Sequence, residues 1–410
     1  MTSPKFMNFA KFAIVIATLC FAWISESTVS TGLEIFLSRY THIVKGKRVA
    51  LLTNQTGVDS KGRSTVSLMH ADKRIDLRML FAPEHGIYGN LKAGETVAGG
   101  VDKKTGLPIV SLYGGKDHKP PPEALDKIDV IIYDIQDVGS RSYTYIWHLA
   151  ECMKAAAEKS KKVIVLDRPN PFGAMSVDGP VTEDKFRSFI GLYPVPRVYG
   201  MTVGEIAMYL NKEERINCNL QVIPMENYRR GMRWQDTGLP WIPPSPNIPN
   251  PDAAMCFAAT GSIGETGVFS LGLGTPLAFQ VISASWLDAN RAANSLNSLR
   301  LPGVFFRAIR FYSKGSTAPA IQMCVISPCS FKPVLTEIAI LCFFKKNYPS
   351  KFKFSADGKS SRIQMFDKAM GTDLVRRGIE AGWDYRKVSG LYQNDLWKFS
   401  QKSKKYMIYR

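Results

Sequence analysis

The chain has 410 residues, 45% of them hydrophobic, so it can bury a large core, and its length favours two domains over one. Its 53 lysines and arginines outnumber its 35 aspartates and glutamates, which gives a formal net charge of +18. The basic residues are scattered and form no stripe with RNA-type aromatic motifs, which argues against nucleic acid as a partner. An anionic polymer such as cell wall, or an anionic membrane surface, remains compatible with the charge.

The first thirty residues have the pattern of a secretory signal peptide. Lys5 and Lys11 precede the mostly apolar run FAIVIATLCFAWI, and a polar stretch follows it. The run is short for a membrane-spanning helix, which needs about 20 residues. We therefore expect residues 1–30 to be removed and the mature protein to be periplasmic or secreted, without stable membrane insertion. An uncleaved anchor is the alternative.

Short apolar or β-branched runs then alternate with segments of helical character. The clearest helices are expected at 142–160 and 202–215, and the second begins with Thr202 and Glu205 in the spacing of a capping box. This alternation predicts an α/β fold with a parallel sheet that helices cover on both faces. The expected strands are 47–53, 75–82, 107–113, 129–135, 162–167 and 220–225.

Polar loops follow four of these strands, with the sequences TNQTG, APEHG, YDIQDVGSR and LDRPNP. The carboxyl ends of parallel strands meet at one edge of an open sheet, where ligands bind, so we expect these loops to converge. The residues expected at this edge are Asn54, Gln55, Glu84, His85, Asp134, Gln136, Asp137, Arg141, Asp167, Arg168 and Asn170.

The motifs of common cofactor sites are missing from the sequence. The first strand is not followed by GxGxxG, and the chain has no GxxxxGK[ST], which leaves little support for a dinucleotide or P-loop site. It also lacks a CxxC pair and a Cys/His cluster with zinc spacing. We expect no cofactor and no metal.

The pattern changes after about residue 235. The segment GLPWIPPSPNIPNPD has six prolines in fifteen residues, which favours an ordered crossover between domains over a helix or central strand, with a plain linker as the alternative. Within it, Trp241 and Asn247 are typical of a sugar platform and a polar clamp. Residues 260–280 combine Glu265 with five glycines in what we expect to be a loop facing the sheet edge. We assign 31–235 to the first domain and 236–410 to a smaller α+β domain.

Several sequence blocks occur in an order that resembles one family: LLTNQTG, FAPEHGIYG, YDIQDVGSRSYTY, LDRPNPFG, GPV, YGMTVGE, WIPPSPNIP and FDKAMGTDLVRRGIEAG. This is a family long catalogued as a domain of unknown function, some of whose members are described as exo-β-N-acetylmuramidases. The resemblance covers about residues 33–410. It implies a Rossmann-like N-terminal domain, a smaller C-terminal domain, a cleft between them, and removal of N-acetylmuramic acid from the non-reducing end of peptidoglycan fragments.

The chain departs from the family pattern at three positions. The family usually reads EGTNxSxGRGT where this chain has ETGVFSLGLGT, so Val268 and Leu273 replace an asparagine and an arginine. Tyr199 stands where relatives commonly carry histidine. These changes motivate an alternative, a cell-wall sugar-binding descendant with weak or lost activity.

Glycoside cleavage needs a proton donor and a second group, usually both carboxyl groups. Glu84 is the candidate donor, because an apolar floor behind a buried strand favours the protonated carboxyl. The second group is Asp134, Asp137 or Glu265, and His85 is expected to orient the carboxyl or bind a sugar hydroxyl.

Other polar residues are candidates for substrate binding. Arg141 and Arg168 are candidate partners of the lactyl carboxylate that distinguishes muramic acid, or else structural partners of Asp137 and Asp167. Tyr143, in the YDIQDVGSRSYTY block, is a further candidate. A metal-dependent hydrolase built from His85, Asp134, Asp137 and Asp167 is the remaining alternative. The expected substrate contacts are Asn54, Gln55, Gln136, Asp137, Arg141, Tyr143, Arg168, Asn170 and Asn247.

Overall fold

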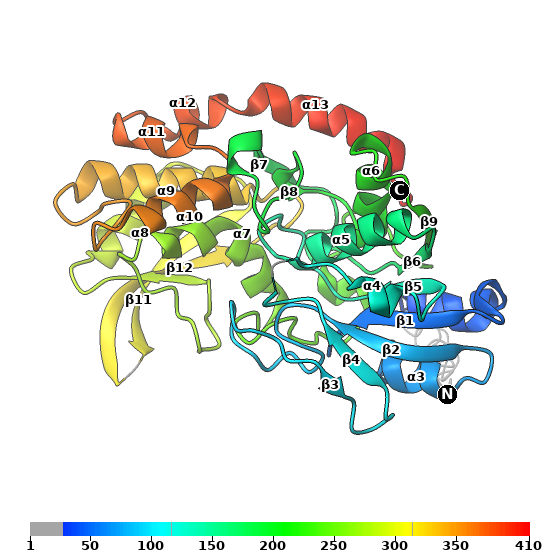
Figure 1. The fold of residues 1–410 in the computed structure, drawn as a ribbon. Coiled ribbons are helices and arrows are strands. Elements are labelled where there is room, and N and C mark those ends of the chain that lie inside the picture. Colours follow the sequence, from blue (N-terminus) through cyan, green and yellow to red (C-terminus); the bar gives the residue numbers. More distant parts are fainter. Residues whose placement is uncertain (1–27, 116, 314) are drawn as a thin grey trace, which may run out of the picture.

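A seven-stranded sheet forms the centre of the N-terminal domain (Figure 1). The computed structural model describes residues 28–115, 117–313 and 315–410, so the expected signal peptide lies almost entirely outside the described residues. The strand order is β3-β4-β2-β1-β5-β6-β9, and all neighbours are parallel except β3 and β4. The strands are β1 (Arg48–Thr53), β2 (Asp76–Ala82), β3 (Gly100–Val101), β4 (Pro108–Ser111), β5 (Val130–Asp134), β6 (Lys162–Leu166) and β9 (Asn219–Ile223).

The six strands expected from the sequence are confirmed as β1, β2, β4, β5, β6 and β9, with small differences at their ends. They were recognisable because the central strands are buried on both faces and therefore read as continuous apolar runs. In β5, all five residues from Val130 to Asp134 are buried. The predicted α/β fold with a parallel sheet is confirmed.

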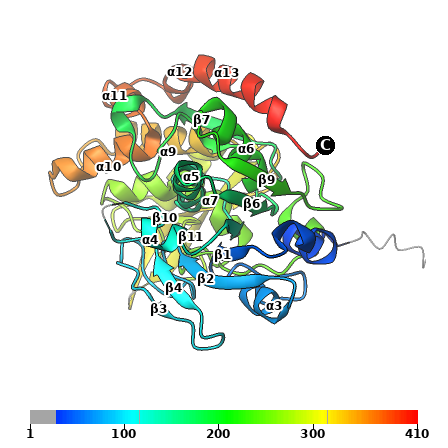
Figure 2. The same cartoon turned by 45° about the vertical axis from the view of Figure 1, so that its right-hand side comes forward.

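Helices cover both faces of this sheet (Figure 2). One face packs against α5 (Tyr145–Glu158) and α6 (Val203–Glu213), and the opposite face packs against α2 (Gly32–Ile35) and α3 (Thr65–Ala71). A further short helix, α4 (Pro122–Leu125), precedes β5. In the described part of the chain, no helix is both long and apolar enough to cross a membrane. Single helical turns occupy Phe36–Tyr40, Thr41–Val44, Asp184–Phe186, Trp234–Thr237 and Lys404–Tyr406.

The second domain is smaller and mixes a sheet with helices. Its antiparallel sheet has the order β10-β12-β11, and one large apolar cluster joins it to the surrounding helices. A two-stranded sheet of β7 (Val177–Val181) and β8 (Pro196–Tyr199), from the first domain, packs against α9 of the second domain, and β7 also contacts α13. The remaining elements are α7 (Pro251–Glu265), β10 (Val281–Ser283), α8 (Ala289–Ser298), β11 (Val304–Ser313), β12 (Ser316–Val325), α9 (Pro333–Asn347), α10 (Ser360–Met370), α11 (Leu374–Glu380), α12 (Tyr385–Gly390) and α13 (Gln393–Ser403).

The last part of the chain returns to the first domain. Helix α13 runs from the second domain toward α6, as the red ribbon of Figure 1 shows. Beyond it, the Tyr409 hydroxyl donates a hydrogen bond of 2.6 Å to Asp167, at the end of the central sheet. The C-terminal end of the chain is thus tied to the N-terminal domain.

Helix α7 was not expected from the sequence. Residues 260–265 were assigned to a glycine-rich loop, but they form the last turns of this helix, so Glu265 is its final residue. Asn250 caps the helix by accepting a hydrogen bond from the Ala253 amide, and Pro251 occupies the first turn, where its missing N–H costs nothing. Gly261 lies within the helix, and a larger residue there would press on Phe257 and approach the Arg197 guanidinium, which explains the glycine.

The capping box of α6 provides a stability test. Thr202 accepts a hydrogen bond from the Glu205 amide, whereas Ser64, at the same position of α3, makes no capping bond with its side chain. We expect Thr202→Ala to lower the free energy of unfolding by about 1 to 2 kcal/mol and Ser64→Ala by less than about 0.5 kcal/mol. Urea unfolding measures both, and equal losses would show that the Thr202 hydroxyl, which also donates to Asp167, stabilises the fold no more than that of Ser64.

Candidate functional site

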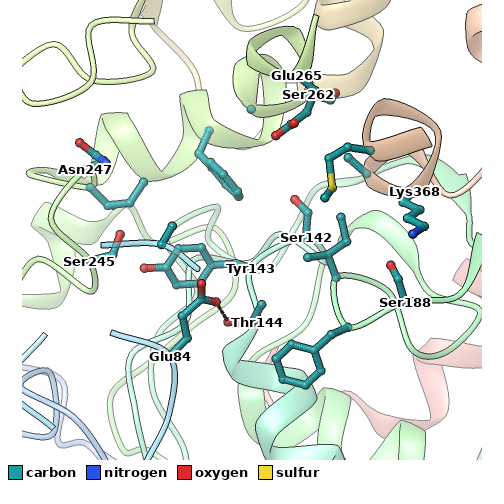
Figure 3. Close-up of a pocket in the computed structure, with 18 of the residues that line it drawn as sticks. Glu84, Ser142, Tyr143, Thr144, Ser188, Ser245, Asn247, Ser262, Glu265 and Lys368 are labelled. Carbon is teal, nitrogen blue, oxygen red and sulfur yellow. Dashed lines mark hydrogen bonds between the residues drawn. The ribbon is translucent and has the colours of Figure 1, made fainter. Parts of the chain in front are cut away.

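A pocket of about 390 Å³ lies between the two domains (Figure 3). Glu84 lies on one side of it and Glu265, from α7, lies on the other. The residues that line the pocket are Glu84, His85, Ala93, Tyr113, His118, Ser142, Tyr143, Thr144, Ser188, Phe189, Ile190, Arg197, Ser245, Asn247, Ile248, Phe257, Gly261, Ser262, Glu265, Phe279, Met365, Lys368 and Ala369.

The backbone around Glu84 makes a sharp turn directly after β2. His85 and Gly86 both have positive φ angles, 69° and 77°, in the left-handed region that most side chains avoid. The Glu84 amide donates a hydrogen bond of 3.1 Å to Nε2 of His148, on α5. Burial lowers the pKa of His148 to about 3, so its ring stays neutral and Nε2 remains an acceptor at neutral pH. His148, interpreted from the sequence as a core histidine, therefore holds the turn that presents Glu84.

The Glu84 carboxyl receives two hydrogen bonds. The Gly94 amide donates to Oε1 at 3.0 Å, and the Thr144 hydroxyl donates to Oε2 at 2.6 Å. Thr144 occupies the N-cap position of α5, but it makes no capping bond with its side chain. The carboxyl consequently lies near the N-terminal end of a 14-residue helix, where the helix dipole favours negative charge. Burial and the nearby Glu84 charge both raise the pKa of the Tyr113 hydroxyl.

Glu265 lies in the opposite environment. It ends α7, and the C-terminal end of a helix disfavours negative charge. Burial raises the pKa of its carboxyl, although the positive charges of Arg362 and Arg197 act in the other direction. The two pocket glutamates thus face helix ends of opposite polarity.

Arg197, on β8, is buried and also lines the pocket. It donates to the Ser262 hydroxyl at 3.2 Å and to the Ala369 carbonyl at 3.0 Å. The Ser262 hydroxyl in turn donates to Glu337, and burial raises the pKa of Glu337 to about 7. Burial also lowers the pKa of Arg197 itself.

The pocket includes five of the residues proposed from the sequence: Glu84, His85, Tyr143, Asn247 and Glu265. The imidazole Nδ1 of His85 lies 2.8 Å from the Leu91 carbonyl, so the ring also holds the loop after it. The Asn247 side chain accepts a hydrogen bond from the Gly274 amide. Trp241, expected as a sugar platform, donates to the Ile248 carbonyl and is not part of the pocket lining.

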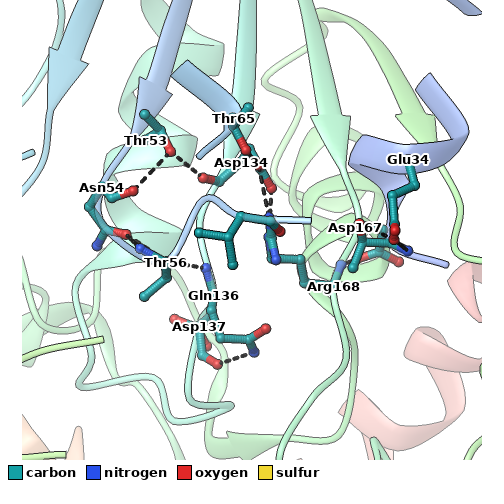
Figure 4. Close-up of polar contacts among 12 residues, drawn as sticks. Glu34, Thr53, Asn54, Thr56, Thr65, Asp134, Gln136, Asp137, Asp167 and Arg168 are labelled. Atoms are coloured by element: carbon teal, nitrogen blue, oxygen red, sulfur yellow. Dashed lines mark hydrogen bonds and ion pairs between the residues drawn. The ribbon is translucent and has the colours of Figure 1, made fainter. Parts of the chain in front are cut away.

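Asp134 and Arg168 form a buried ion pair instead of lining the pocket (Figure 4). Their contacts are 2.6 Å and 2.9 Å, and the Thr65 hydroxyl donates to the same carboxylate. The guanidinium also donates to the Val58 carbonyl. All of these groups are engaged with one another, so the structure does not direct Asp134 toward the reaction or Arg168 toward a substrate carboxylate in this pocket.

Asp137 is also buried outside the pocket lining. Its carboxyl accepts hydrogen bonds from the Gly139 amide, at 2.7 Å, and from the Tyr199 hydroxyl. Burial raises the pKa of Asp137 to about 7, although both hydrogen bonds lower it.

Arg141 serves the architecture of the pocket wall and does not line the pocket itself. It is fully buried, and its guanidinium donates to the carbonyls of Pro180, Val195 and Ala369 at 2.7 to 2.9 Å. Burial lowers its pKa to about 9, which leaves it charged at neutral pH. The expectation that its guanidinium faces a substrate carboxylate does not fit this geometry.

The remaining proposed contacts hold loops together at the sheet edge (Figure 4). Asn54 accepts two bonds from Thr56, and Gln55 donates to the Pro243 carbonyl. Gln136 donates to the carbonyls of Asp137 and Pro169, and Asn170 donates to that of Met201. None of these four side chains lines the pocket.

Several pocket residues were missed by the sequence reasoning, above all Arg197, Lys368, Thr144 and Ser262. Lys368 belongs to the FDKAMGTDLVRRGIEAG block, so its presence in a block shared with the family could have marked it as a candidate. Arg197 and Ser262 have no such signal, because β8 and α7 are brought to the pocket only by the packing of the two domains.

The metal-site alternative finds no support in the described geometry. Across residues 28–115, 117–313 and 315–410, no group of three or more His, Cys, Asp or Glu side chains is placed to hold a metal ion. Asp167, one of the proposed ligands, instead accepts hydrogen bonds from Thr202, Gly204 and Tyr409.

A sugar-sized pocket with a carboxyl group on each side suits glycosidic bond cleavage, in keeping with a two-domain α/β protein of the glycoside hydrolase type. Residues 49–252 match the family described as exo-beta-N-acetylmuramidase NamZ, N-terminal, and residues 255–409 match its C-terminal counterpart. The chain belongs to the exo-β-N-acetylmuramidase NamZ family.

Individual relatives agree with this assignment. The chain is 40% identical over 386 residues to the peptidoglycan beta-N-acetylmuramidase NamZ of Bacillus subtilis (strain 168), covering 93% of this chain and 91% of the relative. It also resembles crystal structures of two DUF1343 family proteins from Bacteroides fragilis NCTC 9343. The first has a TM-score of 0.87 and 37% identity over 93% of this chain and 99% of the other. The second has a TM-score of 0.72 and 30% identity over 94% and 99%.

The three departures from the family pattern lie outside the pocket lining. Tyr199 is buried with its hydroxyl on Asp137, and Val268 packs against the apolar cluster of the second domain. Leu273 is 48% exposed on the loop whose next residue, Gly274, donates to Asn247. None of the three residues present at these positions forms part of the pocket wall.

The buried ion pair allows a test of whether Asp134 is structural. Asp134→Asn leaves the Arg168 charge buried without its partner, so we expect unfolding to become easier by about 3 to 5 kcal/mol. Asp129→Asn is the matched control, because Asp129 pairs with Arg48 at a site where both side chains are partly exposed, and it should cost less than about 1 kcal/mol. Urea unfolding measures both. A large loss of kcat with unchanged stability would show instead that Asp134 takes part in the reaction.

Proposed function

We propose that the protein is an exo-acting glycoside hydrolase that releases terminal N-acetylmuramic acid from the non-reducing end of peptidoglycan fragments. The observation that carries this proposal is the facing pair of Glu84 and Glu265, one from each domain, in a chain of the exo-β-N-acetylmuramidase NamZ family. The relative from Bacillus subtilis is a peptidoglycan beta-N-acetylmuramidase, which supports the same substrate class here.

The size and lining of the site suit a sugar. Its volume of about 390 Å³ is within the range of small-molecule pockets, roughly 300 to 1,000 Å³. Apolar side chains such as Phe189, Ile190 and Phe257 share the walls with the hydroxyls of Ser142, Ser188 and Ser245. Such a mixture suits a sugar, which has apolar ring faces and polar edges.

The helix ends near the two carboxyl groups suggest which one is ionised and which one donates the proton. Glu84 receives two hydrogen bonds near the N-terminal end of α5, so we assign it the carboxylate that faces the positive charge developing on the sugar ring. Glu265 is partly buried at the C-terminal end of α7, where a raised pKa favours the protonated form, so we assign it the proton donor. The sequence suggested the donor role for Glu84, but hydrogen-bond donors surround its carboxyl where an apolar floor was expected.

Leaving-group dependence tests this division. Glu265→Gln should lower kcat by about 10²-fold to 10⁴-fold on a natural disaccharide, whose alkoxide needs protonation, and far less on a nitrophenyl muramide. Glu84→Gln should lower kcat strongly on both substrates. Glu226→Gln, at an exposed pair with Arg39, is the control and should leave both rates unchanged.

Two results would contradict the assignment. If Glu84→Gln, and not Glu265→Gln, shows the dependence on the leaving group, the proton donor is Glu84. If both variants turn over the disaccharide at nearly the normal rate, neither carboxyl takes part.

We also propose that the protein is exported. The support is the sequence pattern of residues 1–30, in which Lys5 and Lys11 precede an uncharged apolar run. A periplasmic or secreted location would bring the pocket to peptidoglycan fragments.

Cell fractionation with mass spectrometry tests the location. The exported protein should lack the residues up to about Ser30, and a chain beginning at residue 31 should remain in the cytosol. Full-length protein in the cytosol would refute the proposal.

A further inference from the structure

We propose that Lys368 binds the carboxylate of the lactyl group that distinguishes muramic acid from N-acetylglucosamine. This inference rests on the proposed function and deepens it, because it names the residue that selects the anionic sugar. Lys368 belongs to α10 and lines the pocket.

Lys368 is a pocket cation with no acidic partner. Among the described residues, no carboxylate forms an ion pair with its ammonium, and its side chain makes no hydrogen bond. By contrast, Arg362, in the first turn of the same helix, forms an ion pair with Asp357 at 3.0 Å. An ammonium from the lining of a pocket, with its donors unpaired, can bind an anionic ligand by charge-assisted hydrogen bonds.

The arginines near the pocket that could bind a carboxylate already use guanidinium donors in bonds to protein atoms. Arg168 pairs with Asp134, and the Arg141 guanidinium donates to three backbone carbonyls. Arg197 lines the pocket but directs Nη1 at Ser262 and the Ala369 carbonyl. Of these cations, Lys368 is the one that has no side-chain donor engaged by the described protein atoms, whereas Arg197 has Nη1 engaged.

Lys368 is held in place by the residue beside it. The Ala369 carbonyl accepts hydrogen bonds from both Arg141, at 2.7 Å, and Arg197, at 3.0 Å. Two buried guanidinium groups thus fix the end of α10. A side chain at Gly371 would collide with the Arg141 guanidinium, so the helix end fits closely against it.

The surroundings of Lys368 match the other parts of a lactyl group. Figure 3 shows Lys368 and Ser188 on the same side of the pocket, away from Asn247 and Ser245. In the described structure, the buried Ser188 hydroxyl and the buried Nε of Arg197 have no hydrogen-bond partner. Ile190 and Met365 line the same pocket and offer apolar contacts to the lactyl methyl. An ammonium, a free hydroxyl and apolar side chains together suit a short branched carboxylate.

Binding by the full chain tests the inference independently of turnover. Calorimetry measures Kd for N-acetylmuramic acid and for its neutral lactyl amide, with wild type, Lys368→Met and Lys368→Arg. The wild type should prefer the acid by about 10-fold to 100-fold, and Lys368→Met should lose this preference without weakening amide binding. Lys368→Arg should retain much of it. Lys359→Met, at an exposed lysine next to the same helix, is the control and should behave as wild type.

The outcomes separate this inference from the proposed function. Equal affinity of the wild type for acid and amide, no binding of either, or equal weakening of both by Lys368→Met would overturn the role of Lys368. Turnover of muramides in any of those cases would leave the hydrolase assignment standing. An intact preference for the acid that depends on Lys368, with no turnover of any muramide, would overturn the hydrolase assignment alone.

Discussion

The geometry of the pocket depends on one backbone carbonyl, that of Ala369, which two buried arginines share. Arg141 follows β5 and Arg197 lies on β8, whereas Ala369 is in the last turn of α10 in the second domain. The last carbonyls of a helix have no partner within the helix and carry its negative end, so they are suitable acceptors for a guanidinium. This contact joins the domains and sets one wall of the pocket.

The same use of helix ends organises the chemistry of the site. The Glu84 carboxyl lies near the N-terminal end of α5, through Thr144, and Glu265 is the last residue of α7. The two glutamates are therefore close to helix ends of opposite partial charge. Thr144 makes this possible, because its hydroxyl donates to Glu84 and does not cap its own helix. The neutral ring of His148 fixes the backbone of the turn. Position, more than residue type, distinguishes the two carboxyl groups.

The polar loops at the sheet edge have a structural role, although their polar residues had suggested substrate binding. Asp134 and Arg168 pair with each other, and Gln136 and Asn170 donate to nearby backbone carbonyls, all from buried positions. A buried polar group needs a partner, and a network of such groups gives the loops a single conformation. These residues therefore support the pocket from behind.

The sequence by itself determined the α/β class, the six main strands, the capping of α6 and the presence of Glu84 in a loop after β2, because these features follow from local apolar patterns and turn residues. The family resemblance added Glu265. Only the tertiary structure decided that Asp134, Arg141 and Arg168 turn inward and that Arg197 and Lys368 reach the pocket. The physical reason is that a charged side chain has no fixed partner in the sequence. Its partners come from segments tens to hundreds of residues away, and the packing of two domains selects which charges are paired and which face a ligand.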